Sequence, residues 1–338
     1  MSDLQVLQAQ FLQLCEENKV DSASKQRLLR ETLNLLADDI PEADVKMVGK
    51  TLAEIRLGLD VFKPYQAWRK VSVFGSARTK PDHPQYVQTK ACGKALKEAG
   101  FMVITGGGPG MMQAANEGAG REASFGVGIN LPMEQELNPV VHESPRSFEC
   151  QYFFTRKLFF LKESDAVILT PGGFGTFDEG FELLTLLQTG RNPPIPVIML
   201  EAPGDDFWGP FLKSWMRRLL NDGLISPEDT GLLFHTDNAD TAVQYIHDYY
   251  VNYHSFRYVG NQILLRLNNA LSEHALARLN AEFSDVLHKG EIEQVKNWPE
   301  NDDVCFAHYP RLRMRLQHHR MSVLPDMIRR MNALYLQD

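Results

Sequence analysis

Residues 166–179 read Ala166-Val-Ile-Leu-Thr170 followed by Pro171-Gly-Gly-Phe-Gly-Thr-Phe-Asp-Glu179, and this stretch predicts the fold. The β-branched apolar run is typical of a buried parallel strand, and Phe181–Gln188 after the loop indicates a helix. Glycines at such a turn let backbone N–H groups approach an anion, and the helix N-terminus adds about half a positive charge. The loop residues expected to bind a phosphate are Gly172, Gly173, Gly175 and Thr176.

Strands alternate with helices on both sides of this stretch. Strands are expected near residues 71–74, 101–105, 126–131, 166–170 and 196–200. This alternation predicts an α/β fold with a doubly wound, Rossmann-like parallel sheet. Ligands of such sheets bind outside the strand carboxyl ends, where two glycine loops and a serine should converge. The additional phosphate-binding candidates at these ends are Ser76, Gly107, Gly108 and Gly110.

The loop Gly106–Gly110 invites a dinucleotide interpretation, which the sequence disfavours. A dinucleotide fingerprint follows the first strand and has an acidic residue about 20 positions later. Here the loop follows the second strand, and Asn130 stands near the acidic position. No Gly-x-x-x-x-Gly-Lys-Ser/Thr motif is present, so ATP hydrolysis by a P-loop is excluded. A mononucleotide phosphate fits better, and the alternative is a tight turn that packs helix against sheet.

Thr176 and Glu179 have two interpretations. Their Thr-x-x-Glu spacing is that of a capping box, in which the glutamate only satisfies a helix N–H group. Alternatively, the glutamate contacts a ligand whose phosphate binds the helix N-terminus. Asp178 should point about 100° away around the helix.

Three motifs in order resemble the LOG ("Lonely Guy") family of nucleoside 5′-monophosphate phosphoribohydrolases. They are Thr105-Gly-Gly-Gly-Pro-Gly-Met-Met112, Phe154-Thr-Arg-Lys157 and Pro171–Glu179. The resemblance covers about Lys70–Val251, and Gly128–Pro139 looks closer to the bacterial purine/pyrimidine nucleotide nucleosidase branch. It implies that Arg156 and Glu179 are the catalytic pair, that no cofactor is needed, and that the protein is a homodimer or higher homo-oligomer with pockets beside the subunit interface.

Hydrolysis of an N-glycosidic bond requires stabilisation of an oxocarbenium-like ribose and a positioned water. Glu179 can serve both needs if the 5′-phosphate binds at the helix N-terminus. Arg156 lies in an aromatic helix, where its charge is expensive without a partner, so we expect it to point into a pocket. It aids the departing base or fixes the substrate; the alternative is a surface arginine packed on aromatic rings. Further pocket candidates are Met111, Asn130, Arg146 and Lys157.

The choice of base is not fixed by sequence. Residues 130–138 and those near Cys150 are expected to line the base pocket. We expect an AMP-like nucleoside monophosphate as substrate. A non-catalytic protein that senses a nucleotide or alarmone through the same pocket is the alternative, and a scaffold with a vestigial site is a third.

Composition excludes several partners. The 338 residues have a net charge of −8, which argues against binding of a nucleic acid polymer. No apolar run approaches about 18 residues and no signal peptide is evident, so we expect no membrane contact and a cytoplasmic location. Cys15, Cys92, Cys150 and Cys305 are far apart and His318-His319 has no ligand spacing, so neither a metal nor a disulfide is expected.

Three parts of the chain differ in pattern. Residues 1–69 form a helical extension, with apolar periodicity from Leu4 to Cys15 and from Leu28 to Leu36. Residues 70–254 form the Rossmann-like catalytic domain. Residues 255–338 form a small α/β unit with a strand at 257–267, a helix at 272–283, a strand at 311–316 and a final helix. Arg311, Arg313 and Arg315 share one strand face, which binds an anionic effector or an acidic subunit, or is simply solvated.

Overall fold

The computed structural model describes residues 6, 10, 13, 22–130, 137–296, 304–317 and 319–337. The chain forms two compact units, Met1–Leu59 and Asp60–Asp338. The apolar periodicity from Leu4 to Cys15, most of the stretch 130–138 and His318 lie outside the described residues. In the part of the chain that is described, no helix has the length and apolar character needed to cross a bilayer.

The first unit is helical. Its elements are α2 (Ala23–Ala37) and most of α3 (Glu42–Phe62), which continues into the second unit. The break predicted at Pro41 falls between them, because proline is tolerated just before a helix and not inside one. No residue of α2 is buried, and Leu28 and Leu36 are 59% and 60% exposed.

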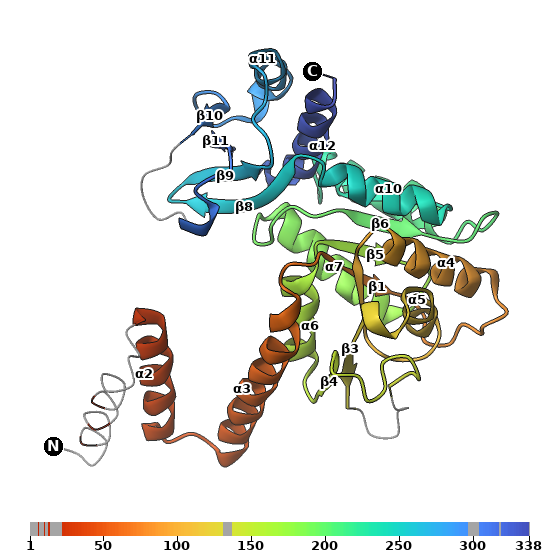
Figure 1. The fold of residues 1–338 in the computed structure, drawn as a ribbon, viewed down its shortest axis with the longest axis vertical. Coiled ribbons are helices and arrows are strands. Elements are labelled where there is room, and N and C mark those ends of the chain that lie inside the picture. The colour runs from red at the N-terminus through yellow and green to blue at the C-terminus, as the bar shows by residue number, and fades with distance from the viewer. Residues whose placement is uncertain are drawn as a thin grey trace. The chain divides into compact units, whose positions relative to one another are not determined.

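The second unit is built on a seven-stranded parallel sheet with the order β4-β3-β2-β1-β5-β6-β7 (Figure 1). The strands are β1 (Lys70–Phe74), β2 (Met102–Thr105), β3 (Ser124–Ile129), β4 (Ser147–Cys150), β5 (Ala166–Leu169), β6 (Val197–Leu200) and β7 (Leu233–Thr236). The predicted doubly wound α/β fold is confirmed. Sequence analysis missed β4 and β7, the two edge strands, because half-buried edges lack the continuous apolar run of a central strand.

Helices cover both faces of this sheet (Figure 1). On one face lie α4 (Pro84–Glu98), α5 (Met111–Ala119) and α10 (Ala239–Tyr249), which share a core with the strand residues Val71, Ile168 and Ile198. On the other lie α6 (Phe153–Glu163) and α7 (Phe174–Gln188), which bury Phe159, Phe160 and Leu183. The short elements are η1 (Lys63–Tyr65), η2 (Arg121–Ala123), α8 (Trp208–Pro210), the π-helical turn η3 (Phe211–Met216), α9 (Arg217–Asn221) and η4 (Pro227–Leu232).

The strand order reverses between β1 and β5. The chain winds from β1 through β2 and β3 to β4 on one side, then crosses to β5 and continues to β7 on the other. Loops that follow β1 and β5 therefore diverge and leave a crevice at their carboxyl ends. The sequence places Ser76 and the Pro171–Thr176 loop there.

The C-terminal part forms a four-stranded antiparallel sheet with the order β10-β11-β9-β8. Its elements are β8 (Tyr253–Val259), β9 (Gln262–Leu267), α11 (Glu273–Phe283), η5 (Ser284–Val286), β10 (Glu293–Val295), η6 (Val304–Phe306), β11 (Arg311–Met314), η7 (Met321–Val323) and α12 (Leu324–Tyr335). The single strand predicted at 257–267 is wrong: Gly260, with φ of 60°, turns the chain into the β8–β9 hairpin.

This C-terminal sheet has an apolar core of its own, which includes the end of α10. Tyr249 of α10 and Tyr253 pack in the same apolar cluster as α11 and α12. The buried Asn332 amide donates to the carbonyl oxygens of Asp248 and Tyr249 at 2.9 and 2.6 Å, which satisfies the C-terminus of α10. A chain that ended at Ser255 would expose this cluster to water.

Two of the three arginines near β11, Arg311 and Arg313, have partners within the fold. Arg311 is only 3% exposed, and its guanidinium donates to the carbonyl oxygens of Phe306 and Ala307. Arg313 pairs with Glu293 on the neighbouring strand. Both side chains are therefore occupied within the fold, which contradicts the expected solvated or effector-binding face for these two.

Candidate active site

The loop between β5 and α7 closes on the loop after β1. A Cβ atom on Gly172 would lie 2.1 Å from the Thr176 hydroxyl and 3.0 Å from the Ser76 nitrogen, so only glycine fits. The Ser76 N–H group donates to the Pro171 carbonyl oxygen at 3.0 Å. The two loops that flank the switch point are thereby held together.

Gly173 and Gly175 have a different environment. A Cβ atom on either residue would meet nothing within 4 Å, so these glycines face open space. Gly173 is the N-cap of α7, and because glycine has no side chain, it does not cap the first N–H groups of the helix. The first N–H groups of a helix lack intrahelical partners, so the backbone here is accessible to an anion.

The capping-box interpretation of Thr176 and Glu179 is wrong. Because α7 begins at Phe174, Thr176 lies inside the first turn and Glu179 lies in the second. Both side chains are buried, with Thr176 4% and Glu179 6% exposed. Glu179 therefore has a role other than satisfying the helix end.

A cavity of about 690 Å³ lies at this switch point. It contains six residues that sequence analysis proposed: Ser76, Arg156, Gly173, Gly175, Thr176 and Glu179. It also contains Gly106 of the second glycine loop, which sequence analysis expected at these strand ends. The lining residues that sequence analysis missed are Phe74, Gly75, Ala77, Arg78, Met112, Ile129, Phe153, Phe160, Phe174 and Phe177. Arg78 had a usable signal, since it follows a strand carboxyl end, but the apolar residues reach the cavity only through tertiary packing.

The second glycine loop serves mainly to bring elements together. A Cβ atom on Gly110 would lie 2.3 Å from the Ser76 carbonyl oxygen, and the Gly107 carbonyl oxygen accepts the Asn138 N–H group. Gly107, Gly108 and Gly110 do not line the cavity, whereas Gly106 does. This matches the tight-turn alternative more closely than a phosphate cradle.

Three further candidates lie away from the cavity. Met111 is 1% exposed and packs beneath Gly75. The Asn130 side chain is exposed, and its N–H group donates to the Cys150 carbonyl oxygen. Arg146 is 7% exposed, and its guanidinium donates to the Tyr65 hydroxyl and to Glu122, each at 2.9 Å. These hydrogen bonds give Arg146 a structural role.

Arg156 and Glu179 face each other inside the cavity. The nearest guanidinium nitrogen of Arg156 lies 4.0 Å from a Glu179 carboxylate oxygen. The Arg156 guanidinium carbon lies 5.0 Å from the ring centre of Phe153 and 5.5 Å from that of Phe160. These rings replace part of the hydration of the arginine and fix its plane. The expectation that this arginine points into a pocket is consistent with this geometry.

Lys157 forms an ion pair with Glu179 from outside the cavity lining. Its ammonium group lies 3.7 Å from Glu179, 2.9 Å from Asp178 and 2.8 Å from Glu182. Burial alone would lower the pKa of Lys157, but hydrogen bonds to Glu182 and Asp178 outweigh it and raise that pKa. Asp178 is 60% exposed, as its place on the helix predicts. Lys157 does not line the cavity.

The carboxyl group of Glu179 is poised for proton exchange near neutral pH. Burial raises its pKa to about 7, although the positive charges of Lys157 and Arg156 lower it. A carboxylic acid with this value has both protonation states available at physiological pH. The group can therefore carry a negative charge against a developing cation, or take a proton from water.

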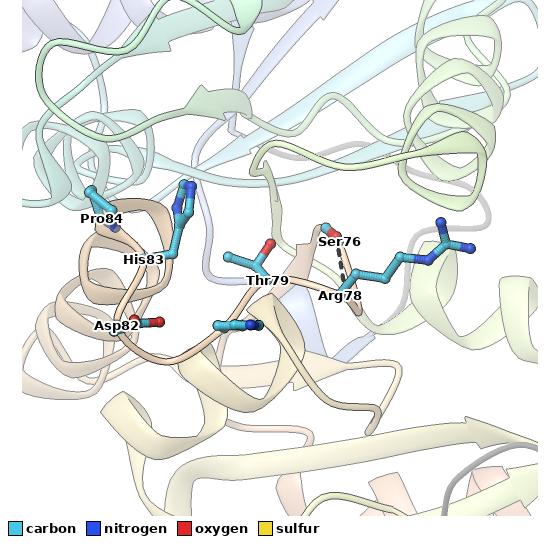
Figure 2. A pocket seen from close by; sticks show the side chains of 7 residues that line it. Ser76, Arg78, Thr79, Asp82, His83 and Pro84 are labelled. Atoms are coloured by element: carbon cyan, nitrogen blue, oxygen red, sulfur yellow. Dashed lines mark hydrogen bonds between the residues drawn. The ribbon is translucent and has the colours of Figure 1, made fainter.

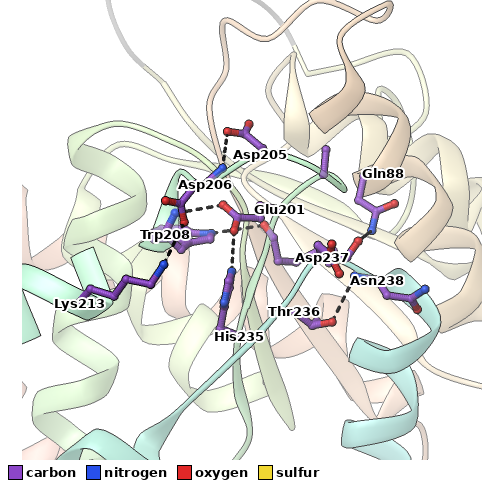
Figure 3. A network of polar contacts seen from close by, with 12 residues as sticks. Gln88, Glu201, Asp205, Asp206, Trp208, Lys213, His235, Thr236, Asp237 and Asn238 are labelled. Atoms are coloured by element: carbon purple, nitrogen blue, oxygen red, sulfur yellow. Dashed lines mark hydrogen bonds and ion pairs between the residues drawn. The ribbon is translucent and has the colours of Figure 1, made fainter. Parts of the chain in front are cut away.

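A polar network joins the carboxyl ends of β6 and β7 (Figure 3). The buried Glu201 accepts the Trp208 N–H group at 3.0 Å and lies 2.6 Å from His235. Trp208 in turn packs edge-on against Phe177, with ring centres 5.7 Å apart. Phe177 borders the cavity, so this network fixes one wall of the site without entering it.

The chain is similar to several known proteins. A profile of the family described as "Possible lysine decarboxylase" matches residues 112–246. A cytokinin riboside 5′-monophosphate phosphoribohydrolase of Mycobacterium tuberculosis is 29% identical over 168 residues, covering 48% of this chain and 87% of that protein. The Oryza sativa subsp. japonica enzyme of the same name, LOG, is 28% identical over 191 residues, covering 55% and 76%.

A solved structure of the molybdenum cofactor carrier protein from Chlamydomonas reinhardtii also matches. Its identity is 20%, its TM-score is 0.37, and the match covers 53% of this chain and 96% of that one. The region matched by the family profile contains Arg156, Glu179 and the α7 loop.

Proposed function

Because the chain belongs to the LOG family, we propose that it hydrolyses the N-glycosidic bond of an AMP-like nucleoside 5′-monophosphate to a free base and ribose 5-phosphate. The observation that carries this proposal is the placement of Arg156 and Glu179, 4.0 Å apart, in a cavity bounded by the N-terminus of α7. No cofactor is required by this reaction.

The 5′-phosphate binds at the start of α7 in this proposal. The open backbone at Gly173 and Gly175 and the side chain of Thr176 supply N–H and O–H donors there. The helix N-terminus favours the negative charge. Glu179 lies one further turn along the same helix, and this position supports a contact between its carboxylate and the ribose.

Glu179 stabilises positive charge on the ribose as the bond to the base breaks, and it orients the attacking water. A carboxylate inside a cavity has a stronger effect than one in water, because the surrounding dielectric constant is lower. Arg156 binds the departing base or fixes the substrate, and its aromatic packing keeps it directed into the cavity. Lys157 positions Glu179 through its charge and through Asp178 and Glu182.

A second copy of the chain is proposed to cover the mouth of the cavity. Large apolar side chains on α6 and α7 are exposed: Phe174 by 96%, Phe154 by 53%, Phe153 by 47%, Phe181 by 41% and Leu158 by 41%. Contiguous exposed apolar surface marks an interaction site. Phe153 and Phe174 also line the cavity, so a covering subunit would complete its wall.

Glu179→Gln should abolish most turnover while leaving AMP binding largely intact. The amide keeps the size and hydrogen bonding of the carboxyl group but carries no charge, and loss of one such electrostatic group costs about 10²–10³ in kcat. Free base released from AMP, measured by chromatography, is the readout, with Glu98→Gln at a 65% exposed glutamate on α4 as a matched control. A Glu179→Gln variant with near-native kcat would refute the proposed role, and native protein that binds AMP without releasing base would indicate a sensor.

Adenosine should be a poor substrate relative to AMP. Without the 5′-phosphate the α7 N-terminus loses its anion, and charge-assisted hydrogen bonds are worth about 1.5–3 kcal/mol each, so kcat/KM should fall about a hundredfold. Thr176→Val should reproduce part of this loss for AMP. The exposed Thr189→Val at the other end of α7 should not. Equal kcat/KM for adenosine and AMP would contradict the assignment of the 5′-phosphate to this loop.

The native protein should be at least a dimer when its molar mass is measured by light scattering. Phe154→Glu places a charge in the exposed apolar surface and should weaken the association, since burial of an unpaired charge is costly. Leu224→Glu is the matched control, because Leu224 is 65% exposed and lies outside α6 and α7. A monomeric native protein would contradict the proposal.

A further inference from the structure

A second cavity opens beside the first, around the loop that follows β1. Its volume is about 610 Å³, and it is lined by Ser76, Arg78, Thr79, Lys80, Asp82, His83 and Pro84 (Figure 2). Ser76 and Arg78 line both cavities, so the two adjoin. Figure 2 shows Thr79 between His83 on one side and Ser76 with Arg78 on the other.

The lining of the second cavity is rich in hydrogen-bond donors. Arg78 and Lys80 are exposed cations, and neither forms an ion pair within the described residues. The Nδ1 atom of His83 accepts the Gln85 N–H group at 3.2 Å, so Nε2 carries the ring proton. Thr79 adds a hydroxyl group. Asp82 is the one carboxylate among the lining residues, so the formal charge of the lining is positive.

The second cavity lies next to the loop to which the phosphate is assigned. The backbone of Ser76 contacts that loop, since its nitrogen would lie 3.0 Å from a Cβ atom on Gly172 and its N–H group donates to Pro171. A group attached to the 5′-phosphate therefore has a path past Ser76 and along Arg78. The path ends among Thr79, Lys80 and His83.

We propose that this second cavity is a subsite for the distal phosphate of a nucleoside 5′-diphosphate, which spans the two cavities with Arg78 between its phosphates. This inference rests on the proposed function, because that function places the first phosphate at α7. The guanidinium of Arg78 suits two neighbouring phosphates, since it presents several donors in a planar fork. A nucleoside 5′-diphosphate then binds more tightly than the monophosphate and competes with it.

The test compares the affinity of ADP and AMP by isothermal titration calorimetry, in EDTA, with the full chain carrying Glu179→Gln so that little substrate is consumed. ADP should bind about three- to tenfold more tightly than AMP, the range expected for one or two partly exposed charge-assisted contacts. The preference should shrink as salt concentration rises, because exposed charges are screened. Inorganic pyrophosphate separates the contribution of the two phosphates from that of the nucleoside. It should bind more weakly than ADP, because it lacks the nucleoside.

Lys80→Ala should remove the preference for ADP and leave the affinity for AMP unchanged. Lys94→Ala is the matched control, because Lys94 is a 68% exposed lysine on α4 outside both cavities. Asp82→Asn should have the opposite effect and increase the preference for ADP, because it removes a negative charge from the lining. ADP binding no tighter than AMP, or an equal loss for both ligands in Lys80→Ala, would overturn the subsite. Native protein that fails to hydrolyse AMP but keeps a Lys80-dependent preference would refute the proposed function and leave the subsite standing.

Discussion

The buried carboxylate of Glu179, held between Arg156 and Lys157, is the interaction on which the rest of the site depends. A carboxyl group that is 6% exposed is costly to ionise, and only the two cations keep its pKa as low as about 7. Each cation needs support of its own. Phe153 and Phe160 pack on Arg156, and Asp178 and Glu182 neutralise Lys157.

The fold supplies this arrangement through two adjacent helices on one face of the sheet. Arg156 and Lys157 lie on α6, Glu179 lies on α7, and both helices bury apolar residues in the same core. The glycines of the β5–α7 loop set where α7 begins and therefore which turn holds the glutamate. Glu201 holds Trp208 (Figure 3), and Trp208 packs against Phe177 of α7 at the edge of the cavity.

Much of this could be predicted from the sequence, and the failures have physical causes. The β5–α7 loop was predicted because glycines, strand and helix are contiguous there, so local rules decide the outcome. The sequence left Gly107, Gly108 and Gly110 between phosphate binding and a tight turn, because a glycine that admits a ligand and a glycine that admits a neighbouring backbone have the same sequence pattern.

Long-range pairing caused the remaining misses. Arg146 was a pocket candidate by charge alone, but its partners Tyr65 and Glu122 come from other segments and nothing local indicates them. The β8–β9 hairpin was predicted as one strand because Gly260 is a lone turn signal in an apolar run. Arg78 follows the same strand end as Ser76, which is a usable signal, but its place beside the β5–α7 loop depends also on the pairing of β1 with β5.

The pH dependence of kcat/KM for AMP tests the central claim most directly. If ionised Glu179 stabilises the ribose cation, kcat/KM should fall about tenfold per pH unit below an apparent pKa near 7 and level off above it, because the free enzyme must lose that proton. Lys157→Met removes a positive charge that lowers this pKa, so the acid limb should move to higher pH. A profile that is flat between pH 5 and 8, or a limb that does not move in Lys157→Met, would contradict the account.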